Sequence, residues 1–262
     1  MCELLALSAN TPTDMRFSFR GLTRRGGDTG EHADGWGLAS YDPDGGGLNI
    51  YREQQPAAFS PVAAHLAERD LKSLYSLAHI RKATQGVVAL ENCHPFQRRW
   101  CGQDWVFAHN GDLKADIPVD GNYRPIGNTD SEAAFCWILN ELGRQFPDSA
   151  DGHALFPVLA RCSAHLAAGG IFNCLISNGD WLYAFCGTKL HTITRRAPFT
   201  TATLADEDLT VDFSQVTTPR DVVTIVSTEP LTSNEQWRRL EVGEALLLEL
   251  GEVVQRSSPR AS

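Results

Sequence analysis

The stretch that follows Met1 decides the predicted fold, and it reads Cys2-Glu3-Leu4-Leu5-Ala6-Leu7-Ser8. Its apolar run predicts a short strand that starts without a preceding linker. Cys2 is therefore expected at the edge of the ordered structure. Because its side chain is small, removal of Met1 is expected, and this would leave a thiol and a free α-amine on one residue. An α-amine titrates at about 7.7 to 8.0 and a thiol at about 8.5, so the amine can accept the thiol proton without a histidine base.

The remaining sequence alternates strand-like and helical segments. Strand-like runs occur at 38–41, 48–51, 75–80, 105–108, 171–177, 181–186, 222–227 and 245–250. Helical spacing is found at 61–74, from Asp130 to Leu139, and at 154–168. Polar composition predicts loops at 9–34 and 195–221, and a C-terminal tail at 253–262. The pattern predicts one α+β domain over residues 2–252, with its sheets covered by helices.

Composition argues against several classes of partner. The chain has 262 residues and a formal net charge of −9, without a run of Lys or Arg that could follow a phosphate backbone. The sequence contains no apolar stretch long enough to span a bilayer, and its first residues lack the layout of a signal peptide. We therefore expect a cytoplasmic protein that binds neither nucleic acid nor a membrane.

The seven cysteines do not form a pattern typical of disulfides or of a metal site. Their number is odd and no CxxC pair occurs. Four of them lie in apolar stretches, where a thiol packs as a small hydrophobe, namely Cys136, Cys162, Cys174 and Cys186. The residues that could form an alternative zinc site are Cys93, His94, Cys101 and His109, but they lack the short paired spacing of structural zinc sites. The sequence thus predicts neither a metal nor another cofactor.

An amide side chain and a glycine follow one of the predicted strands. Asn110-Gly111 comes shortly after the apolar run Trp105-Val106-Phe107-Ala108, so both residues are expected at a strand end. The Asn110 side chain and the Gly111 backbone N–H can form an oxyanion hole, in which one donor typically contributes about 2.7 to 4 kcal/mol. The alternative is that Asn-Gly is a simple hairpin turn.

Two charged residues could hold the ends of an amino acid. Arg81 ends the predicted strand 75–80, and its planar guanidinium suits a carboxylate. Asp130 could bind an ammonium group. The alternatives are that Arg81 forms a surface salt bridge, and that either Thr129 or Asp130 caps the helix that begins here. A basic and an acidic anchor together are what an amino-acid substrate needs.

Six motifs occur in the order and at about the spacing of class II glutamine amidotransferase domains. They are Cys2, Asp34-Gly35-Trp36-Gly37, His79-Ile80-Arg81-Lys82-Ala83-Thr84-Gln85-Gly86, Asn92-Cys93-His94-Pro95-Phe96, His109-Asn110-Gly111 and Thr129-Asp130-Ser131-Glu132. Within that family the chain resembles the stand-alone, YafJ-type members most. The resemblance extends through Ser227-Thr228-Glu229-Pro230-Leu231 to about residue 250.

The resemblance implies a four-layer αββα fold of the N-terminal-nucleophile hydrolase type. By matched position, Cys2 would be the nucleophile with its own amine as base, and Asn110 with Gly111 would form the oxyanion hole. The substrate-binding residues implied in the same way are Arg81 and Thr84 for the α-carboxylate, Asp130 for the α-ammonium and His94 as an organiser of the pocket.

The implied reaction is cleavage of the glutamine side-chain amide through a γ-glutamyl thioester at Cys2, with release of ammonia. Lys82 and Gln85 replace an aromatic residue and a His that are usual in the synthase branches and that serve substrate closure and coupling to an acceptor site. A glutaminase domain of the family would occupy most of this length, so a synthase is expected to be a separate chain that receives the ammonia. Two other functions stay open. One is hydrolysis of a γ-glutamyl amide in small-thiol metabolism such as ergothioneine synthesis, and the other is a non-catalytic, glutamine-binding regulatory module.

Overall fold

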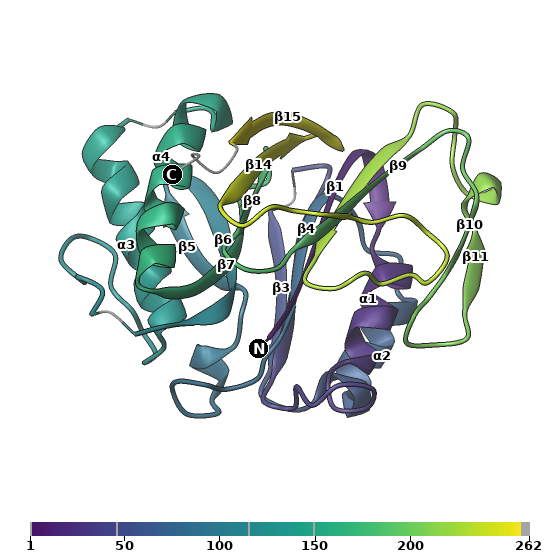
Figure 1. Cartoon of the computed structure of the whole chain (residues 1–262), viewed down its shortest axis with the longest axis horizontal. Coiled ribbons are helices and arrows are strands. Elements are labelled where there is room, and N and C mark those ends of the chain that lie inside the picture. Colours follow the sequence, from purple (N-terminus) through teal and green to yellow (C-terminus); the bar gives the residue numbers. More distant parts are fainter. Residues whose placement is uncertain (1, 46, 115, 149, 258–262) are drawn as a thin grey trace.

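The computed structural model describes residues 2–45, 47–114, 116–148 and 150–257, and its strands form two large sheets (Figure 1). The seven-stranded sheet has the order β13 (Arg238–Arg239), β9 (His191–Arg196), β12 (Val222–Ser227), β1 (Glu3–Asp14), β4 (Lys72–Ile80), β2 (Trp36–Tyr41) and β3 (Leu48–Glu53). The six-stranded sheet has the order β15 (Glu252–Ser257), β14 (Glu244–Glu249), β8 (Leu182–Cys186), β7 (Gly170–Ser177), β6 (Gln103–Leu113) and β5 (Phe96–Trp100).

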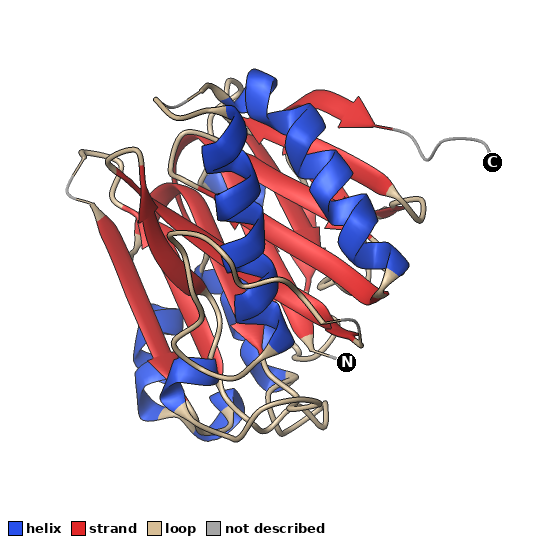
Figure 2. Cartoon of the chain, turned by 90° about the vertical axis from the view of Figure 1, so that its left-hand side faces the viewer, coloured by secondary structure: helices blue, strands red, loops and turns tan. Residues whose placement is uncertain are grey.

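Helices cover the outer face of each sheet. The α-helices are α1 (Arg16–Arg24), α2 (Pro61–Glu68), α3 (Asp130–Gln145) and α4 (Gly152–Ala168). Figure 1 shows α1 and α2 on one side of the two sheets and α3 and α4 on the other. In Figure 2 the long helices α3 and α4 lie across the strands of the six-stranded sheet. The smaller elements are β10 (Thr201–Thr203), β11 (Thr210–Asp212) and the 3-10 turns Ala57–Phe59, Leu90–Asn92 and Phe213–Gln215.

Alternation along β1 explains why the sheets stack. Leu5 and Leu7 point outward and pack in one apolar cluster with Phe19 of α1. Leu4 and Ala6 point inward and pack in a second cluster against the six-stranded sheet. Since successive side chains of a strand face opposite sides, a strand that is apolar at both sets of positions is buried on both faces.

The six-stranded sheet is built in the same way. Val106 of β6 belongs to the inner cluster, whereas its neighbour Phe107 packs with Phe135 of α3 and Leu159 of α4 in a third cluster. Three apolar clusters thus separate four layers, in the order helices, sheet, sheet, helices. The αββα arrangement expected from the sequence is confirmed.

The sequence prediction was wrong for the segment after the first strand. The expected loop at 9–34 contains the end of β1 and the whole of α1. Gly21 and Thr23 lower the intrinsic helix propensity of this segment, but burial of Phe19 and Leu22 against the sheet outweighs that preference. The helix expected at 61–74 ends at Glu68, because residues 72–80 pair with β1 as β4.

Two further expectations were wrong near the C-terminus. The loop expected at 195–221 contains β10 and β11, which pair with each other. The tail expected from residue 253 instead begins as β15, which pairs with β14 from Glu249↔Glu252 to Ala245↔Ser257. β15 is an edge strand, so its polar and half-buried side chains gave no strong strand signal. Residues 258–262 of that tail lie outside the described residues.

Gly111 offers a direct test of how closely β6 and β7 approach. A Cβ atom at Gly111 would lie 1.8 Å from the backbone oxygen of Ile171, so Gly111→Ala requires the two strands to separate. We expect a loss of about 3 kcal/mol in the free energy of unfolding, at the upper end of typical overpacking costs, measured by urea denaturation.

The matched control is Gly143→Ala, in the interior of α3, where the new Cβ would meet only an ordinary contact at 3.8 Å. This helical substitution should stabilise the protein by about 0.5 to 1 kcal/mol. Equal unfolding free energies for the two variants would contradict the described approach of β6 and β7.

Candidate functional site

Cys2 lies directly before β1, beside the end of β4. The pair Glu3↔Ile80 places it next to Arg81, and its Sγ both accepts from the Lys82 N–H and donates to the Lys82 carbonyl, each at 3.3 Å. Cys2 is only 7 % exposed, but it belongs to none of the three apolar clusters of the described residues. It is therefore buried at the polar end of the sheets and not in their apolar interior.

The charges around Cys2 come from both predicted anchors. Burial raises the pKa of the Cys2 thiol, while the backbone contact with Lys82 and the positive charge of Arg81 lower it. The carboxylate of Asp130 raises this pKa again. Since electrostatic effects of this kind need proximity, the structure brings the thiol, the cation and the anion to one region.

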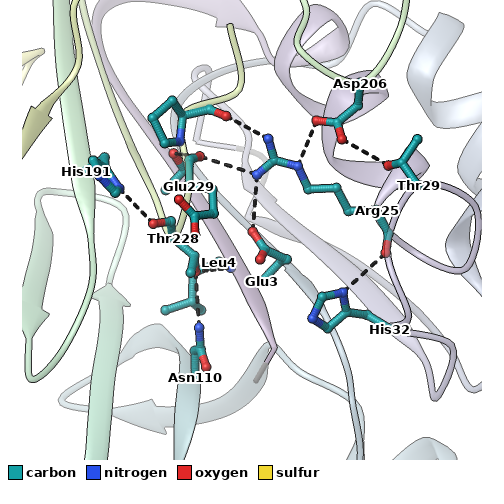
Figure 3. Close-up of polar contacts among 12 residues, drawn as sticks. Glu3, Leu4, Arg25, Thr29, His32, Asn110, His191, Asp206, Thr228 and Glu229 are labelled. Carbon is teal, nitrogen blue, oxygen red and sulfur yellow. Dashed lines mark hydrogen bonds and ion pairs between the residues drawn. The ribbon is translucent and has the colours of Figure 1, made fainter. Parts of the chain in front are cut away.

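Asn110 reaches this region from the other sheet. Its side chain lies on the inner face of β6, as do Val106 and Ala108, and it is buried. The Asn110 Nδ2 donates to Thr228 Oγ1 at 3.2 Å, and the same oxygen accepts from the Leu4 N–H at 2.9 Å (Figure 3). One threonine hydroxyl therefore joins Asn110 to β1, the strand that follows Cys2 directly.

The sequence placed Asn110-Gly111 at the end of a strand, and that position was wrong. β6 continues to Leu113 and pairs with β7 throughout, with Asn110 opposite Asn173. The hairpin-turn alternative is wrong for the same reason. The pairing of β6 with β5 ends at Phe107, so one edge of β6 beyond that residue has no strand partner in the described part of the chain.

Arg81 is buried and binds backbone oxygens. Its guanidinium donates to the carbonyls of Asp34 at 3.4 Å and of Gln85 at 3.2 Å. The surface salt bridge considered as an alternative is not formed with any described carboxylate, and the side chain is 3 % exposed. Arg81 is thus a buried cation whose partners in the described residues are neutral, which is unusual unless a ligand supplies a negative charge.

Asp130 begins α3, but it does not cap that helix. Thr129 is the cap, because its hydroxyl accepts from the Glu132 N–H at 3.2 Å. The Asp130 carboxylate instead accepts from the Leu113 N–H at 2.8 Å, which ties the start of α3 to the end of β6.

Gln85 connects the two anchors, a role that the sequence gave no sign of. Its side-chain Nε2 donates to the Leu113 carbonyl at 2.9 Å and to Asp112 Oδ1 at 2.5 Å. Its backbone carbonyl accepts from the Arg81 guanidinium. Hydrogen bonds therefore run from Arg81 through Gln85 and Leu113 to Asp130. Beside them lies a cavity of about 360 Å³, lined in part by Gln85, Thr129 and Asp130.

The remaining predicted residues lie apart from these contacts. Thr84 is exposed on the loop after β4. His94 is buried between the rings of His79 and Phe96, with centroid distances of 4.1 and 4.4 Å, and neither of its ring nitrogens has a hydrogen-bond partner among the described residues. Its expected role in organising the pocket stays a prediction. The residues of the alternative zinc site are not gathered into one group, since Cys101 is exposed while the other three are buried.

Three buried histidines make the stability of the protein depend on pH. Burial lowers the pKa of His79 to about 3, lowers that of His94 well below its usual range, and lowers that of His109. An unfolded histidine binds a proton near pH 6.5, so the unfolded state binds more protons than the folded state below that pH. The stability contributed by neutral His79 is complete above pH 6.5 and is lost as the pH falls toward 3.

We therefore expect the free energy of unfolding to fall steadily between pH 7 and pH 4. His79 alone accounts for about 3.5 kcal/mol over this range, at about 1.4 kcal/mol per pH unit below its unfolded pKa of 6.5. Denaturant titrations of His79→Gln should show a shallower dependence, because glutamine does not titrate and can still donate to the His109 carbonyl. The control is His65→Gln, at an exposed position of α2. An unchanged slope in His79→Gln would contradict this account.

Comparison with known proteins agrees with the family and the fold expected from the sequence. A family model described as class-II glutamine amidotransferases matches residues 1–262. The chain belongs to this family. It is 49% identical over 256 residues to a protein of Escherichia coli K12 named "Putative glutamine amidotransferase YafJ", covering 97% of this chain and 100% of that protein. A relative of the same description from Haemophilus influenzae is 45% identical, over 97% of this chain and 86% of its own length.

Solved structures place this amidotransferase in a fold family. The crystal structure of a predicted glutamine amidotransferase from Pseudomonas aeruginosa is 45% identical and superposes with a TM-score of 0.77, covering 97% of this chain and 100% of that one. The glutamine phosphoribosylpyrophosphate amidotransferase of Bacillus subtilis superposes with a TM-score of 0.61 at 16% identity, over 98% of this chain and 49% of its own. The fold is that of the N-terminal-nucleophile hydrolases. No helix in the described ranges is long and apolar enough to cross a membrane.

Proposed function

We propose that this class II glutamine amidotransferase hydrolyses the side-chain amide of glutamine, with the Cys2 thiol as nucleophile and the α-amine of Cys2 as base. One observation carries the proposal. The Thr228 hydroxyl contacts both Asn110 and the backbone of Leu4, so one side chain links the amide proposed to bind the oxyanion to the residue two positions after the proposed nucleophile. The free amine requires loss of Met1, a residue that lies outside the described ranges.

The reaction would proceed in two steps that share one base. The amine takes the thiol proton, and the sulfur attacks the amide carbon to give a tetrahedral oxyanion. The Asn110 side chain and the Gly111 N–H would stabilise that oxyanion. The C–N bond then breaks, the amine returns its proton to the nitrogen, and ammonia leaves a γ-glutamyl thioester on Cys2. Water, deprotonated by the same amine, cleaves the thioester to glutamate and regenerates the thiol.

Substrate binding would use the charges that the structure brings near Cys2. Arg81 would bind the α-carboxylate with help from Thr84, and Asp130 would bind the α-ammonium. The burial of Arg81 among neutral partners supports an anionic ligand, and the hydrogen bonds through Gln85 would hold the two anchors at a fixed separation. Ammonia would either leave into solution or pass to a separate synthase chain.

The test of this proposal is ammonia release from glutamine by Cys2→Ala. We expect the rate to fall below about one-thousandth of the wild-type rate, because no other group would replace the nucleophile. Cys101→Ala, which removes an exposed cysteine after β5, is the matched control and should keep the wild-type rate. Wild-type turnover by Cys2→Ala would refute the nucleophile. A wild-type protein that binds glutamine without releasing ammonia would instead indicate a regulatory binding module.

A further inference from the structure

Thr228 lies between the two sheets and contacts residues that are far from it in the sequence. It follows β12 directly and is 4 % exposed. Its hydroxyl oxygen accepts from the Leu4 N–H and lies 3.2 Å from the Asn110 amide (Figure 3). Leu4 is 224 residues away in the sequence and Asn110 is 118 away, so the contact is formed only in the folded chain.

The backbone around Thr228 is held on several sides, so its hydroxyl has a fixed place. Its N–H donates to the Leu4 carbonyl at 3.1 Å, and its carbonyl accepts from His191 Nδ1 at 2.8 Å. Arg25 donates to the carbonyl of Glu229, as Figure 3 shows, and also to the carbonyl of Pro230.

Arg25 is in turn fixed by two carboxylates. It forms ion pairs with Glu3 at 3.2 Å and with Asp206 at 2.8 Å, and its side chain is about 10 % exposed. Glu3 is the residue next to Cys2, so the same buried cation anchors both the start of β1 and the segment that contains Thr228.

The Asn110 amide is incompletely satisfied as it is oriented in the structure. Nδ2 donates to Thr228, while the buried Oδ1 has no hydrogen-bond partner among the described residues. An unsatisfied buried acceptor costs about 1 to 3 kcal/mol. The two ends of an amide side chain have the same shape, so a half-turn exchanges them without moving any other atom.

The Thr228 hydroxyl can serve either orientation, because its second lone pair can accept from Nδ2 and its hydrogen can be donated to Oδ1, and an oxyanion at the far end of the amide selects the second. One of its lone pairs is taken by the Leu4 N–H, and its hydrogen remains free to donate. After the half-turn that hydrogen is donated to Asn110 Oδ1, which removes the unsatisfied acceptor. Both Nδ2 hydrogens then point away from Thr228, where they can bind a developing oxyanion.

We infer that Thr228 is a positioning residue, whose hydroxyl holds the Asn110 amide with its NH2 group directed at the reacting carbonyl. This inference rests on the proposed function, because it assigns Thr228 a part in the proposed oxyanion hole. The Thr228 hydroxyl then has two separate effects. The bond from Leu4 stabilises the fold, whereas the bond to Asn110 acts on the transition state.

The experiment measures kcat, KM for glutamine and Tm for Thr228→Val and Thr228→Ser. Valine has nearly the shape of threonine but cannot donate, so Asn110 loses the partner that sets its orientation. We expect kcat to fall about 10- to 100-fold with KM within about twofold, since an oxyanion contact is made only in the transition state. Serine keeps the hydroxyl and should restore kcat to within about threefold of wild type.

Two comparisons separate positioning from a loss of stability. Thr192→Val removes another buried hydroxyl, one that donates to the Ile225 carbonyl at 3.0 Å in the same sheet, and should lower Tm without lowering kcat. In a background of Asn110→Ala, Thr228→Val should cause no further loss of kcat, because the two residues act as one unit.

Wild-type kcat in Thr228→Val, or an equal additional loss in the Asn110→Ala background, would overturn the inference. If Thr228→Val does not fold, Thr228→Cys takes its place, because a thiol is a weak donor and a lowered kcat is expected there as well. The proposed function fails separately, if wild-type protein and Cys2→Ala release ammonia at the same rate.

Discussion

The antiparallel pairing of β1 between β4 and β12 is the constraint on which the rest of the structure depends. Outward residues of β1 pack under α1, and inward residues pack against the six-stranded sheet. The same pairing fixes Cys2 beside Arg81 and Lys82, and it brings Leu4 to Thr228. A single strand therefore determines both the layering of the domain and the position of Cys2.

Burial gives the site a particular electrostatic character. Cys2, Arg81 and Asn110 are all buried, and the charges that act on the thiol come from residues at the ends of different elements. In a region with little water, charges and dipoles interact more strongly than they do at the surface. The same burial raises the thiol pKa, so an adjacent base is needed to generate the thiolate near neutral pH. An α-amine on Cys2 itself would meet that need.

Sequence could predict the residues at strand ends, but not those that depend on distant pairing. Cys2 and Arg81 were placed well, because an apolar run followed by a polar residue locates the end of a strand. Asn110 was placed wrongly at a strand end, because β6 is extended by pairing with β7, some sixty residues further along the chain. Local patterns do not contain that register.

Other features were missed for related reasons. α1 has weak intrinsic helix propensity and is stabilised by packing, and β15 is a polar edge strand. The side chains of Thr228 and Gln85 form hydrogen bonds to residues far away in the sequence, and a hydroxyl or amide in a sequence carries no sign of its partner.

The proposed chemistry requires Cys2 to be the nucleophile and also to carry the free amino terminus. The most direct measurement is mass spectrometry of the native chain, intact and after peptide mapping, following reaction with a glutamine-mimicking electrophile. The account predicts a chain without Met1 that carries one adduct, on the sulfur of Cys2. An adduct on Cys101 or another cysteine, a labelled chain that retains Met1, or a chain that is not labelled would contradict it.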